Sequence, residues 1–254
     1  MKPLKLLKRP AKNYSMGRAG WIKAWKRVER VVSQSHVVLE LVDARFPFRS
    51  PKLRKLVNLK KRSLILVINK SDLLAPAEVR KLAEETGGIP ISARARRGKA
   101  RLLRLLKSRI RGGQELRVGV VGRPNVGKSS LINYLAGRRS AKVGAEAGFT
   151  KGEQWIKIHP RILLIDSPGI IYEGESESDL ILQNALEIDK HKDPIEVALL
   201  LIKKHPEILG KFKLKKKGEA SLEELAVKLG KLKKGGEPNL TEAAKIMVRK
   251  WQRS

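Results

Sequence analysis

The chain has 254 residues, of which 41% are apolar, enough for one large domain or for a medium domain with a small one. This apolar share excludes global disorder, and the lack of cysteine excludes a disulfide scaffold and thiolate metal sites. The net charge of +31 is uneven: residues 36–121 hold 21 basic and 7 acidic side chains, whereas residues 170–196 hold 2 and 8. High growth temperature adds charges of both signs, but an excess of one sign destabilises a compact chain unless a polyanion relieves it, so we expect nucleic-acid binding.

No targeting segment or metal cluster stands out in the sequence. The apolar runs are too short to span a membrane, and the basic N-terminus lacks an apolar stretch of signal-peptide length. The four histidines are scattered, so we expect no zinc site. We therefore expect a cytoplasmic monomer without a membrane partner.

The first part of the chain alternates between helix and strand patterns. A helix is predicted over residues 15–33, where Trp21 and Trp25 lie one turn apart. Packing of this pair against a domain is favoured over stacking on bases. A strand over residues 36–42 then leads into a polar loop, residues 43–47, at a strand end where α/β sheets bind ligands.

Two further apolar runs, residues 63–68 and 89–91, predict strands with a helix over residues 76–85 between them. Apolar strands separated by helices indicate a mostly parallel sheet that is buried on both faces. Residues 94–111 hold nine basic side chains and no acidic ones around four leucines, which predicts a helix with one buried stripe. A solvated face is the simpler interpretation, but nine like charges in one segment favour contact with phosphates.

The stretch from Gly122 to Ser130 has the phosphate-loop pattern G-x-x-x-x-G-K-[ST]. It lies between a predicted strand over residues 116–121 and a predicted helix over residues 131–136, which is the context that the motif requires. A glycine-rich turn that fits the pattern by chance is the alternative, and the correct flanks disfavour it.

Each residue type of this loop suits a bound nucleotide. Gly122 and Gly127 let the backbone approach an anion closely. The Lys128 ammonium suits the β- and γ-phosphates, and the Ser129 hydroxyl can join the shell of Mg²⁺, a cation that prefers oxygen. Amides at a helix start point at phosphates, and those expected to do so here belong to Val126, Gly127, Lys128, Ser129 and Ser130.

Beyond the phosphate loop the pattern changes from strands to helices. A glycine-containing loop over residues 141–150 precedes strands over residues 154–158 and 162–165, and the second strand ends in Asp166-Ser-Pro-Gly169. Helices are then predicted over about residues 179–190, 195–204, 221–231 and 239–251.

Two pairs in this part have capping-box spacing, Ser221 with Glu224 and Asn239 with Glu242, and they predict helix starts. The lysine cluster Lys211–Lys217 predicts a basic loop or helix end.

A second motif, Asn69-Lys-Ser-Asp72, follows the strand at residues 63–68 and indicates which base is bound. Guanine presents its N1–H and 2-amino donors side by side, and the carboxylate of Asp72 can accept both. Adenine lacks a donor at N1, and such a site can reject it by a factor of about 10⁴. The Asn69 amide can serve the guanine acceptors and brace the loop, and the Lys70 stem can lie over the base. Alone, the motif would be equally compatible with a charged turn.

Together these motifs resemble those of the translation-factor-like GTPases, in an unusual order. The base-reading residues Asn69–Asp72 and Ser92-Ala93 come before the phosphate loop, and Thr150 and Asp166–Gly169 come after it. This order is similar to that of the circularly permuted GTPases. The segment Asp43-Ala-Arg-Phe-Pro47, together with a helical tail ending at residue 251, resembles the YlqF/RbgA family of ribosome-assembly GTPases. The resemblance implies an α/β P-loop GTPase with the motif order G4-G5-G1-G2-G3, a mostly parallel sheet and a small C-terminal α-helical domain.

The resemblance also implies roles for the matched residues. Backbone atoms of Ser92 and Ala93 would meet the guanine carbonyl. Thr150 would close onto Mg²⁺ and the γ-phosphate, Asp166 would hold Mg²⁺ through water, and the Gly169 amide would touch the γ-phosphate. The implied metal ligands are Ser129, Thr150 and Asp166, and the implied catalytic residues are Lys128, Thr150, Gly169 and Asn125.

Residue Ile170 stands where many GTPases have a water-orienting glutamine, and an aliphatic side chain cannot position water by hydrogen bonding. The family shares this substitution, and in such GTPases Asn125 is expected to help hold K⁺ near the phosphates. The resemblance therefore implies slow hydrolysis of GTP to GDP alone and faster turnover on the ribosomal particle.

We predict a basic arm over residues 1–13, a GTPase domain over residues 14–175 and a helical RNA-binding domain over residues 176–254. The favoured function is a GTPase that binds ribosomal RNA of an immature, large subunit and leaves on hydrolysis. One alternative is an RNA-binding scaffold whose nucleotide only tunes affinity. Another is the small-subunit assembly GTPase with an OB barrel and a zinc site, which the short N-terminal segment and the lack of cysteine disfavour.

Overall fold

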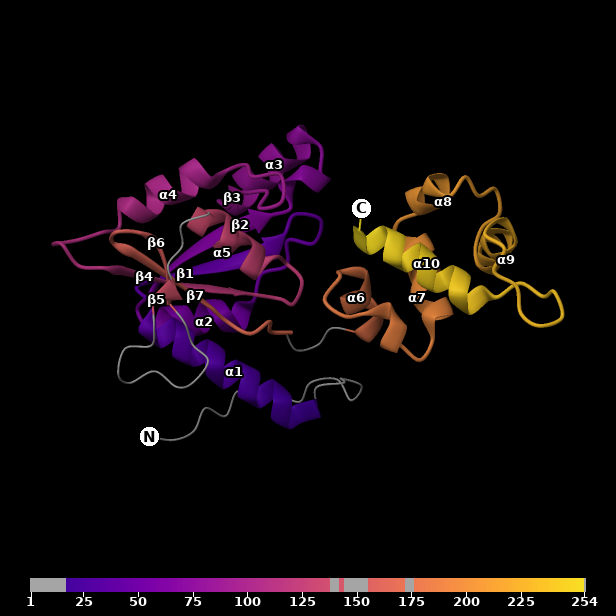
Figure 1. The fold of residues 1–254 in the computed structure, drawn as a ribbon, viewed down its shortest axis with the longest axis horizontal. Coiled ribbons are helices and arrows are strands. Elements are labelled where there is room, and N and C mark those ends of the chain that lie inside the picture. The colour runs from indigo at the N-terminus through magenta and orange to yellow at the C-terminus, as the bar shows by residue number, and fades with distance from the viewer. Residues whose placement is uncertain (1–16, 138–141, 144–154, 172–175, 254) are drawn as a thin grey trace. The chain divides into compact units, whose positions relative to one another are not determined.

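A computed structural model describes residues 17–137, 142–143, 155–171 and 176–253. The chain divides near Glu173 into two compact units, the first built on a sheet and the second helical (Figure 1). The predicted basic arm, residues 1–13, and Thr150 lie outside the described residues.

One sheet with the strand order β3-β2-β1-β4-β7-β6-β5 organises the first unit. Its parallel strands confirm the predicted α/β class: β1 (Val37–Asp43), β2 (Ser63–Asn69), β3 (Ile89–Pro90), β4 (Leu116–Gly122) and β7 (Ile162–Asp166). At one edge β6 (Trp155–His159) and β5 (Lys142–Val143) are antiparallel, and β5 lies where only a loop was predicted. Because parallel strands end at the same edge, Asp43, Asn69, Gly122 and Asp166 share one rim of the sheet.

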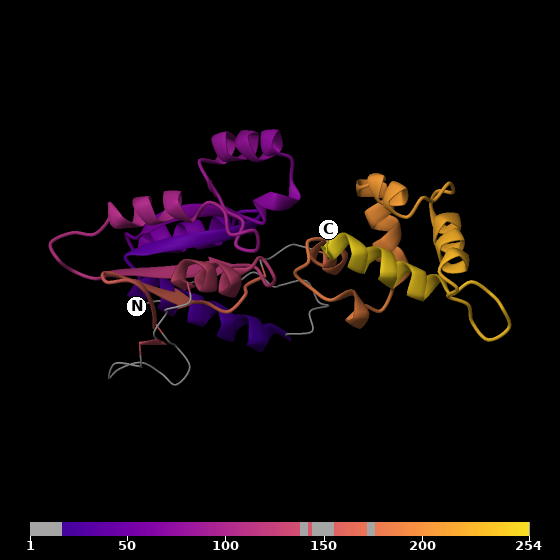
Figure 2. The same cartoon turned by 45° about the horizontal axis from the view of Figure 1, so that its top comes forward.

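Helices cover both faces of this sheet (Figures 1 and 2). On one face, α1 (Gly17–Gln34) and α2 (Pro51–Leu59) bury Trp25 and Val57, among others, against β1 and β7. On the other face, α4 (Lys99–Lys107) and α5 (Lys128–Ala136) bury leucines of both helices against β1, β2 and β4. The turn η1 (Ser71–Leu73) and α3 (Pro76–Thr86) follow β2.

The helix α2 was not predicted, although the sequence contains its start signal. The Ser50 hydroxyl accepts a hydrogen bond from the Leu53 amide at 3.0 Å, and Pro51 occupies the first helical position. Leu53 and Val57, four residues apart, are both buried. A nine-residue helix with only two buried positions gives too weak a periodic pattern to be found by apolar spacing.

The second unit is built from α6 (Glu177–Leu182), the turn η3 (Ile188–Lys190), α7 (Pro194–Lys204), α8 (Glu207–Lys211), α9 (Glu219–Lys228) and α10 (Leu240–Arg253). The prediction of one helix over residues 179–190 was wrong, since α6 ends at Leu182. Asn184 takes a left-handed conformation with φ 58°, and the amides of Asn184 and Ala185 bond back to the carbonyls of Ile181 and Leu180. This pattern closes a helix end, and asparagine tolerates it better than most residues do.

Of the two predicted capping boxes, one starts a helix and one does not. The Asn239 side chain accepts from the Glu242 amide at 3.1 Å at the start of α10, which confirms that helix start. The Ser221 prediction was wrong, because α9 begins two residues earlier and the Ser221 hydroxyl donates to Gly218. Glu224 instead accepts from the amides of the preceding lysine loop, residues 215 and 216.

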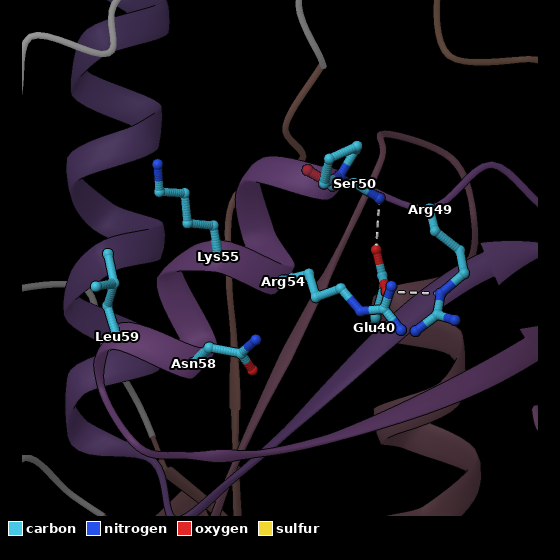
Figure 3. A pocket seen from close by; sticks show the side chains of 8 residues that line it. Glu40, Arg49, Ser50, Arg54, Lys55, Asn58 and Leu59 are labelled. Carbon is cyan, nitrogen blue, oxygen red and sulfur yellow. Dashed lines mark hydrogen bonds and ion pairs between the residues drawn. The ribbon is translucent and has the colours of Figure 1, made fainter.

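A pocket of about 550 Å³ lies beside α2, with the buried carboxylate of Glu40 in its wall (Figure 3). Glu40 accepts from the Ser50 amide at 2.7 Å and from Arg49 Nε at 3.4 Å, so it ties the loop before α2 to the middle of β1. Burial raises the pKa of Glu40, and these two donors oppose the rise. None of the predicted site residues lines this pocket.

We expect Glu40→Gln to change the free energy of unfolding little and Glu40→Leu to lower it by about 1–3 kcal/mol. Glutamine keeps an acceptor for the buried Ser50 amide, whereas leucine does not. Because the folded-state pKa of Glu40 is raised, the contribution of Glu40 to the free energy of unfolding is largest below the unfolded-state pKa. This contribution is lost as the pH rises through the folded-state pKa. Urea unfolding across this range should therefore show wild type losing stability relative to Glu40→Gln. Equal costs for the two substitutions would contradict the acceptor role.

Candidate nucleotide-binding site

The phosphate loop joins β4 to α5 at the rim where the parallel strands end. A Cβ at Gly122 would lie 2.4 Å from the Leu41 carbonyl oxygen, so only glycine fits beside β1. Gly127 has a φ of 94° and caps α5, which begins at Lys128. The first turn of α5 therefore presents the amides of residues 128–130 at the loop, in the arrangement that binds anions.

The Lys128 side chain folds over this loop. Its ammonium donates to the Arg123 carbonyl at 2.8 Å and to the Gly122 carbonyl at 3.3 Å. Burial lowers the pKa of Lys128, and the carboxylate of Asp166 counteracts part of this effect. The lysine thus holds a positive charge against the loop at the place predicted for phosphates.

Ser129 and Asp166 meet although they are 37 residues apart. The Ser129 hydroxyl donates to Asp166 Oδ2 at 2.9 Å, and Asp166 Oδ1 is buried with no hydrogen-bond partner in the described part of the chain. Burial raises the pKa of Asp166, against the effects of Ser129 and Lys128. A hydroxyl next to a carboxylate with an unsatisfied oxygen is a hard donor set, and it fits Mg²⁺ and its water shell.

The D-x-x-G segment lies directly on the phosphate loop. A Cβ at Gly169 would come within 2.8 Å of the Pro124 nitrogen, and the Ile170 amide donates to the Gly122 carbonyl at 3.2 Å. The Ile170 side chain is buried in the same core cluster as Trp25 and Val28 of α1. It therefore points into the core and offers nothing polar at this rim.

The indole of Trp21 also reaches this segment. Its Nε1 donates to the Ile171 carbonyl at 3.0 Å, and its ring stacks on Trp25 with centroids 6.1 Å apart. The ammonium of Lys52 lies 4.2 Å and 4.7 Å from the two ring centroids. Trp25 is buried, so the predicted packing role of the tryptophan pair is confirmed.

The buried amide of Asn69 connects the base-reading motif with the phosphate loop. Its Nδ2 donates to the Val126 carbonyl at 2.8 Å, and its Oδ1 accepts from the Ala93 amide at 3.1 Å. A Cβ at Gly127 would lie 2.4 Å from this Nδ2. One side chain thus joins three segments that were predicted separately, and it braces the loop as the sequence suggested.

Around Asn69, the other residues that were predicted to read the base lie on short turns. Asp72 is exposed on η1, and the Ser71 amide donates to the Ile91 carbonyl at 3.2 Å. Ser92 is buried; its hydroxyl accepts from the Ala95 amide at 2.9 Å, and its backbone pairs with Arg97. These bonds leave the Asp72 carboxylate facing solvent beside a well-supported Ser92–Ala93 turn.

The segment Asp43–Pro47 contributes a side chain that sequence analysis did not place in the site. Asp43, at the end of β1, accepts from Arg45 at Nε (3.1 Å) and Nη2 (2.9 Å), and its Oδ2 lies 2.8 Å from Lys70 Nζ. Burial alone would raise the pKa of Asp43, but Arg45 and Lys70 outweigh it and hold the pKa below its usual range. The direct pairing of β1 with β2, with Asp43 opposite Asn69, could have suggested this contact.

The structure thus brings most of the predicted residues together at one rim, by hydrogen bonds or close packing. Asn125 lies in the loop, exposed and left-handed with φ 57°, and Ser130 is exposed on the first turn of α5. Thr150, the remaining predicted ligand, lies outside the described residues.

No helix in the described part of the chain has the length and hydropathy that crossing a bilayer requires.

Comparison with known proteins gives two family matches. The RsgA GTPase family matches residues 32–173, and the family described as 50S ribosome-binding GTPase matches residues 117–233. An uncharacterized GTP-binding protein of Methanocaldococcus jannaschii is 37% identical over 89% of this chain and 64% of its own length. Nuclear/nucleolar GTPase 2 of Arabidopsis thaliana is 34% identical over 91% of this chain and 43% of its own length. The chain thus spans less than two thirds of these curated relatives.

Among solved structures, YlqF from Thermotoga maritima in its GNP-bound form superimposes with a TM-score of 0.64 at 24% identity. The match covers 91% of this chain and 94% of that one. This likeness agrees with the observed sheet, in which the predicted base-reading motifs precede the phosphate loop in sequence. The chain therefore belongs to the RsgA GTPase family of circularly permuted P-loop GTPases, and its fold is that of YlqF.

Proposed function

We propose that this protein binds GTP, hydrolyses it to GDP and phosphate, and does so in ribosome assembly while bound to ribosomal RNA of an immature large subunit. The observation that supports the nucleotide site most strongly is the pair of hydrogen bonds from Asn69. They tie the base-reading loop to a phosphate-loop carbonyl 57 residues away, at 2.8 Å, and to the Ser92–Ala93 turn. Guanine recognition and phosphate binding need this spatial relation.

In this proposal the chain supplies binding, orientation and charge. Asp72 accepts from the guanine edge, Lys70 covers the base, and the amides of residues 126–130 hold the phosphates. Lys128 neutralises charge that develops on the γ-phosphate, and the Gly169 amide contacts the same group. Mg²⁺ would supply positive charge that offsets the negative charge of the phosphates. Ser129, Asp166 and Thr150 would hold it.

Hydrolysis by the isolated protein should be slow. The buried side chain of Ile170 cannot orient the attacking water, so this chain lacks the polar group that many GTPases use there. We propose that Asn125, exposed in the loop, helps hold K⁺ near the phosphates and that a ribosomal particle completes the site. K⁺ would supply positive charge, and the particle would supply a group that orients the attacking water, in place of the polar side chain that Ile170 lacks.

Ribosomal partnership is supported by charge and by family. The net charge of +31 favours binding to a polyanion such as RNA. One matching family is described as a 50S ribosome-binding GTPase. We assign residues 14–175 to the GTPase domain, residues 176–254 to an RNA-binding helical domain, and residues 1–13 to a basic arm. A monomer in the cytoplasm is our expectation, although the plant relatives are named nuclear/nucleolar.

We expect Lys128→Ala to reduce GTP hydrolysis by about 10²–10³-fold, the usual effect of removing one group that stabilises transition-state charge. Phosphate release should be followed with purified large and small subunits, in K⁺ or Na⁺ buffer, with Lys23→Ala on the exposed face of α1 as the matched control. Stimulation by large subunits and by K⁺ is the expected result for wild type. Stimulation by small subunits alone would favour the small-subunit alternative.

A scaffold that only senses nucleotide is the second candidate, favoured by the cationic surface and by Ile170. It predicts that Lys128→Ala still supports subunit assembly in cells and that wild type gains no hydrolysis from any particle. Loss of assembly together with loss of hydrolysis would reject the scaffold.

A further inference from the structure

The edge of the sheet where the parallel strands begin lies opposite the proposed nucleotide site. This edge carries a strongly cationic surface. A groove of about 330 Å³ lies where β1, β2 and β4 begin, between the turn that precedes β2 and the loop that joins α4 to β4. Its charged lining includes Lys61, Arg109, Arg111, His36 and Glu115. We call this surface the amino-edge groove.

Three of these cations, Lys61, Arg109 and Arg111, line the same groove. Gly112 and Gly113, with φ of 53° and 80°, turn the chain back towards β4 just after Arg111. Arg109 reaches across to the start of β2, where Nη1 donates to the Ser63 hydroxyl at 3.1 Å. This bond links the two sides of the groove, and the side chains of Lys61 and Arg111, which also line it, are exposed.

Few carboxylates compensate this charge. Within the described ranges, no carboxylate forms an ion pair with Lys61, Arg109 or Arg111, and Glu115 lies 3.6 Å from Lys157. The cations at the nucleotide rim differ, because Lys70 pairs with Asp43 and Lys128 donates to backbone carbonyls. Uncompensated like charges cost stability unless an anion binds there.

A histidine also lies in the wall of the groove. His36, just before β1, accepts from the Arg117 amide at Nδ1 and sits in the groove wall. Partial burial lowers the pKa of His36, and the nearby charges of Arg117 and Arg62 lower it further. Only the arginine charges, which are the smaller part of this effect, would also attract an anion, because burial disfavours charge of either sign.

We propose that the amino-edge groove binds the sugar–phosphate backbone of RNA, independently of the nucleotide site. A groove lined by three cations without a carboxylate partner in the described ranges fits a repeating anion better than a single phosphate ion. Seven-residue strands separate the two rims by on the order of 20 Å, so RNA can occupy this edge while nucleotide occupies the other. This inference rests on the proposed RNA-binding function and names one surface that performs it.

The test compares two charge reversals of equal size. The groove variant carries Lys61→Glu, Arg109→Glu and Arg111→Glu, and the control carries Lys23→Glu, Lys26→Glu and Arg27→Glu on the exposed face of α1. Affinity for a fluorescein-labelled RNA hairpin of mixed sequence is measured by anisotropy over a series of KCl concentrations. Affinity for fluorescent GDP, with magnesium, is measured on the same preparations.

The groove variant should lose about 10²-fold in RNA affinity at low salt, and its salt slope should fall by about 2–3, since each phosphate contact contributes about 0.7–0.9. The control should lose only a few-fold, and GDP affinity should be unchanged in both. Equal RNA affinities and slopes for the two variants would overturn the groove while leaving RNA binding elsewhere intact. A wild type that binds GDP but no RNA would overturn both the groove and the proposed RNA partnership.

Discussion

Asp72→Asn should lower GTP and GDP affinity by about 10²–10⁴-fold and transfer the preference to xanthine nucleotides. The carboxylate is proposed to accept two hydrogen bonds from guanine, each worth about 1.5–3 kcal/mol when one partner is charged. An asparagine amide offers one acceptor and one donor at the same place, and the donor suits the 2-oxo group of xanthine. Fluorescence titration with GDP and XDP measures both affinities on one preparation.

The position of Asp72 makes this test clean. The side chain is exposed on η1, so its replacement should leave the fold intact, and recovered XDP binding would itself show an intact phosphate site. Glu84→Gln, an exposed position on α3 with the same change in charge, is the matched control. Unchanged GDP affinity in Asp72→Asn would remove Asp72 from the base site.

The strands and their polar ends could be predicted because both are local properties of the sequence. Buried parallel strands need continuous apolar residues, and the predicted runs at residues 63–68 and 116–121 match β2 and β4 to within one residue. Parallel pairing then places Asn69 and Gly122 at the same edge without any further information. The rim of the site therefore followed from the fold class.

Contacts between side chains at that rim could not be predicted in the same way. Whether Asn69 faces the phosphate loop or the base depends on the turn after β2, where Lys70 is left-handed with φ 59°. That conformation is set by tertiary contacts, such as the bond from the Ala44 amide to the Asn69 carbonyl at 2.8 Å. The spacing of residues in the sequence does not predict such a hydrogen bond between distant segments.

Two errors in the helical unit also concern hydrogen bonds that residue spacing does not determine. Apolar residues continue past Leu182, so their spacing predicted one long helix, but a single left-handed residue, Asn184, ends α6. The Ser221–Glu224 spacing failed because Glu224 found better donors in the lysine loop, at 2.9–3.2 Å. In both cases residue spacing did not determine the hydrogen bonds that form, which are local helix-end bonds at Asn184 and bonds from the amides of Lys215 and Lys216 at Glu224.

Asp43→Ala should cost about 3–5 kcal/mol of unfolding free energy, the usual result of removing one member of a buried ion pair. The side chain of Asp43 is 3% exposed and those of Arg45 and Lys70 are 9% and 22% exposed, so two cations would be left close together with little water. Lys70 would also leave its place beside the base-reading turn. We therefore expect weaker GDP binding in addition to the loss of stability.

The pH dependence of this effect has a defined sign. Because the folded-state pKa of Asp43 is lowered, its contribution is present above the unfolded-state pKa of about 3.8 and is lost as the pH falls through the folded-state value. The stability difference between wild type and Asp43→Ala should therefore be constant near neutral pH and should shrink below about pH 4. Urea unfolding at a series of pH values measures it.

A double-mutant cycle separates the ion pair from simple loss of packing. Asp43→Asn keeps the shape of the side chain, and Lys70→Met keeps the stem that would lie over the base while removing the charge. If Asp43 acts by holding the Lys70 ammonium, the double variant should be more stable than the sum of the single effects predicts, by at least about 1 kcal/mol. Additive losses would mean that Asp43 serves Arg45 and its own loop, and that Lys70 is placed by the backbone of the turn alone.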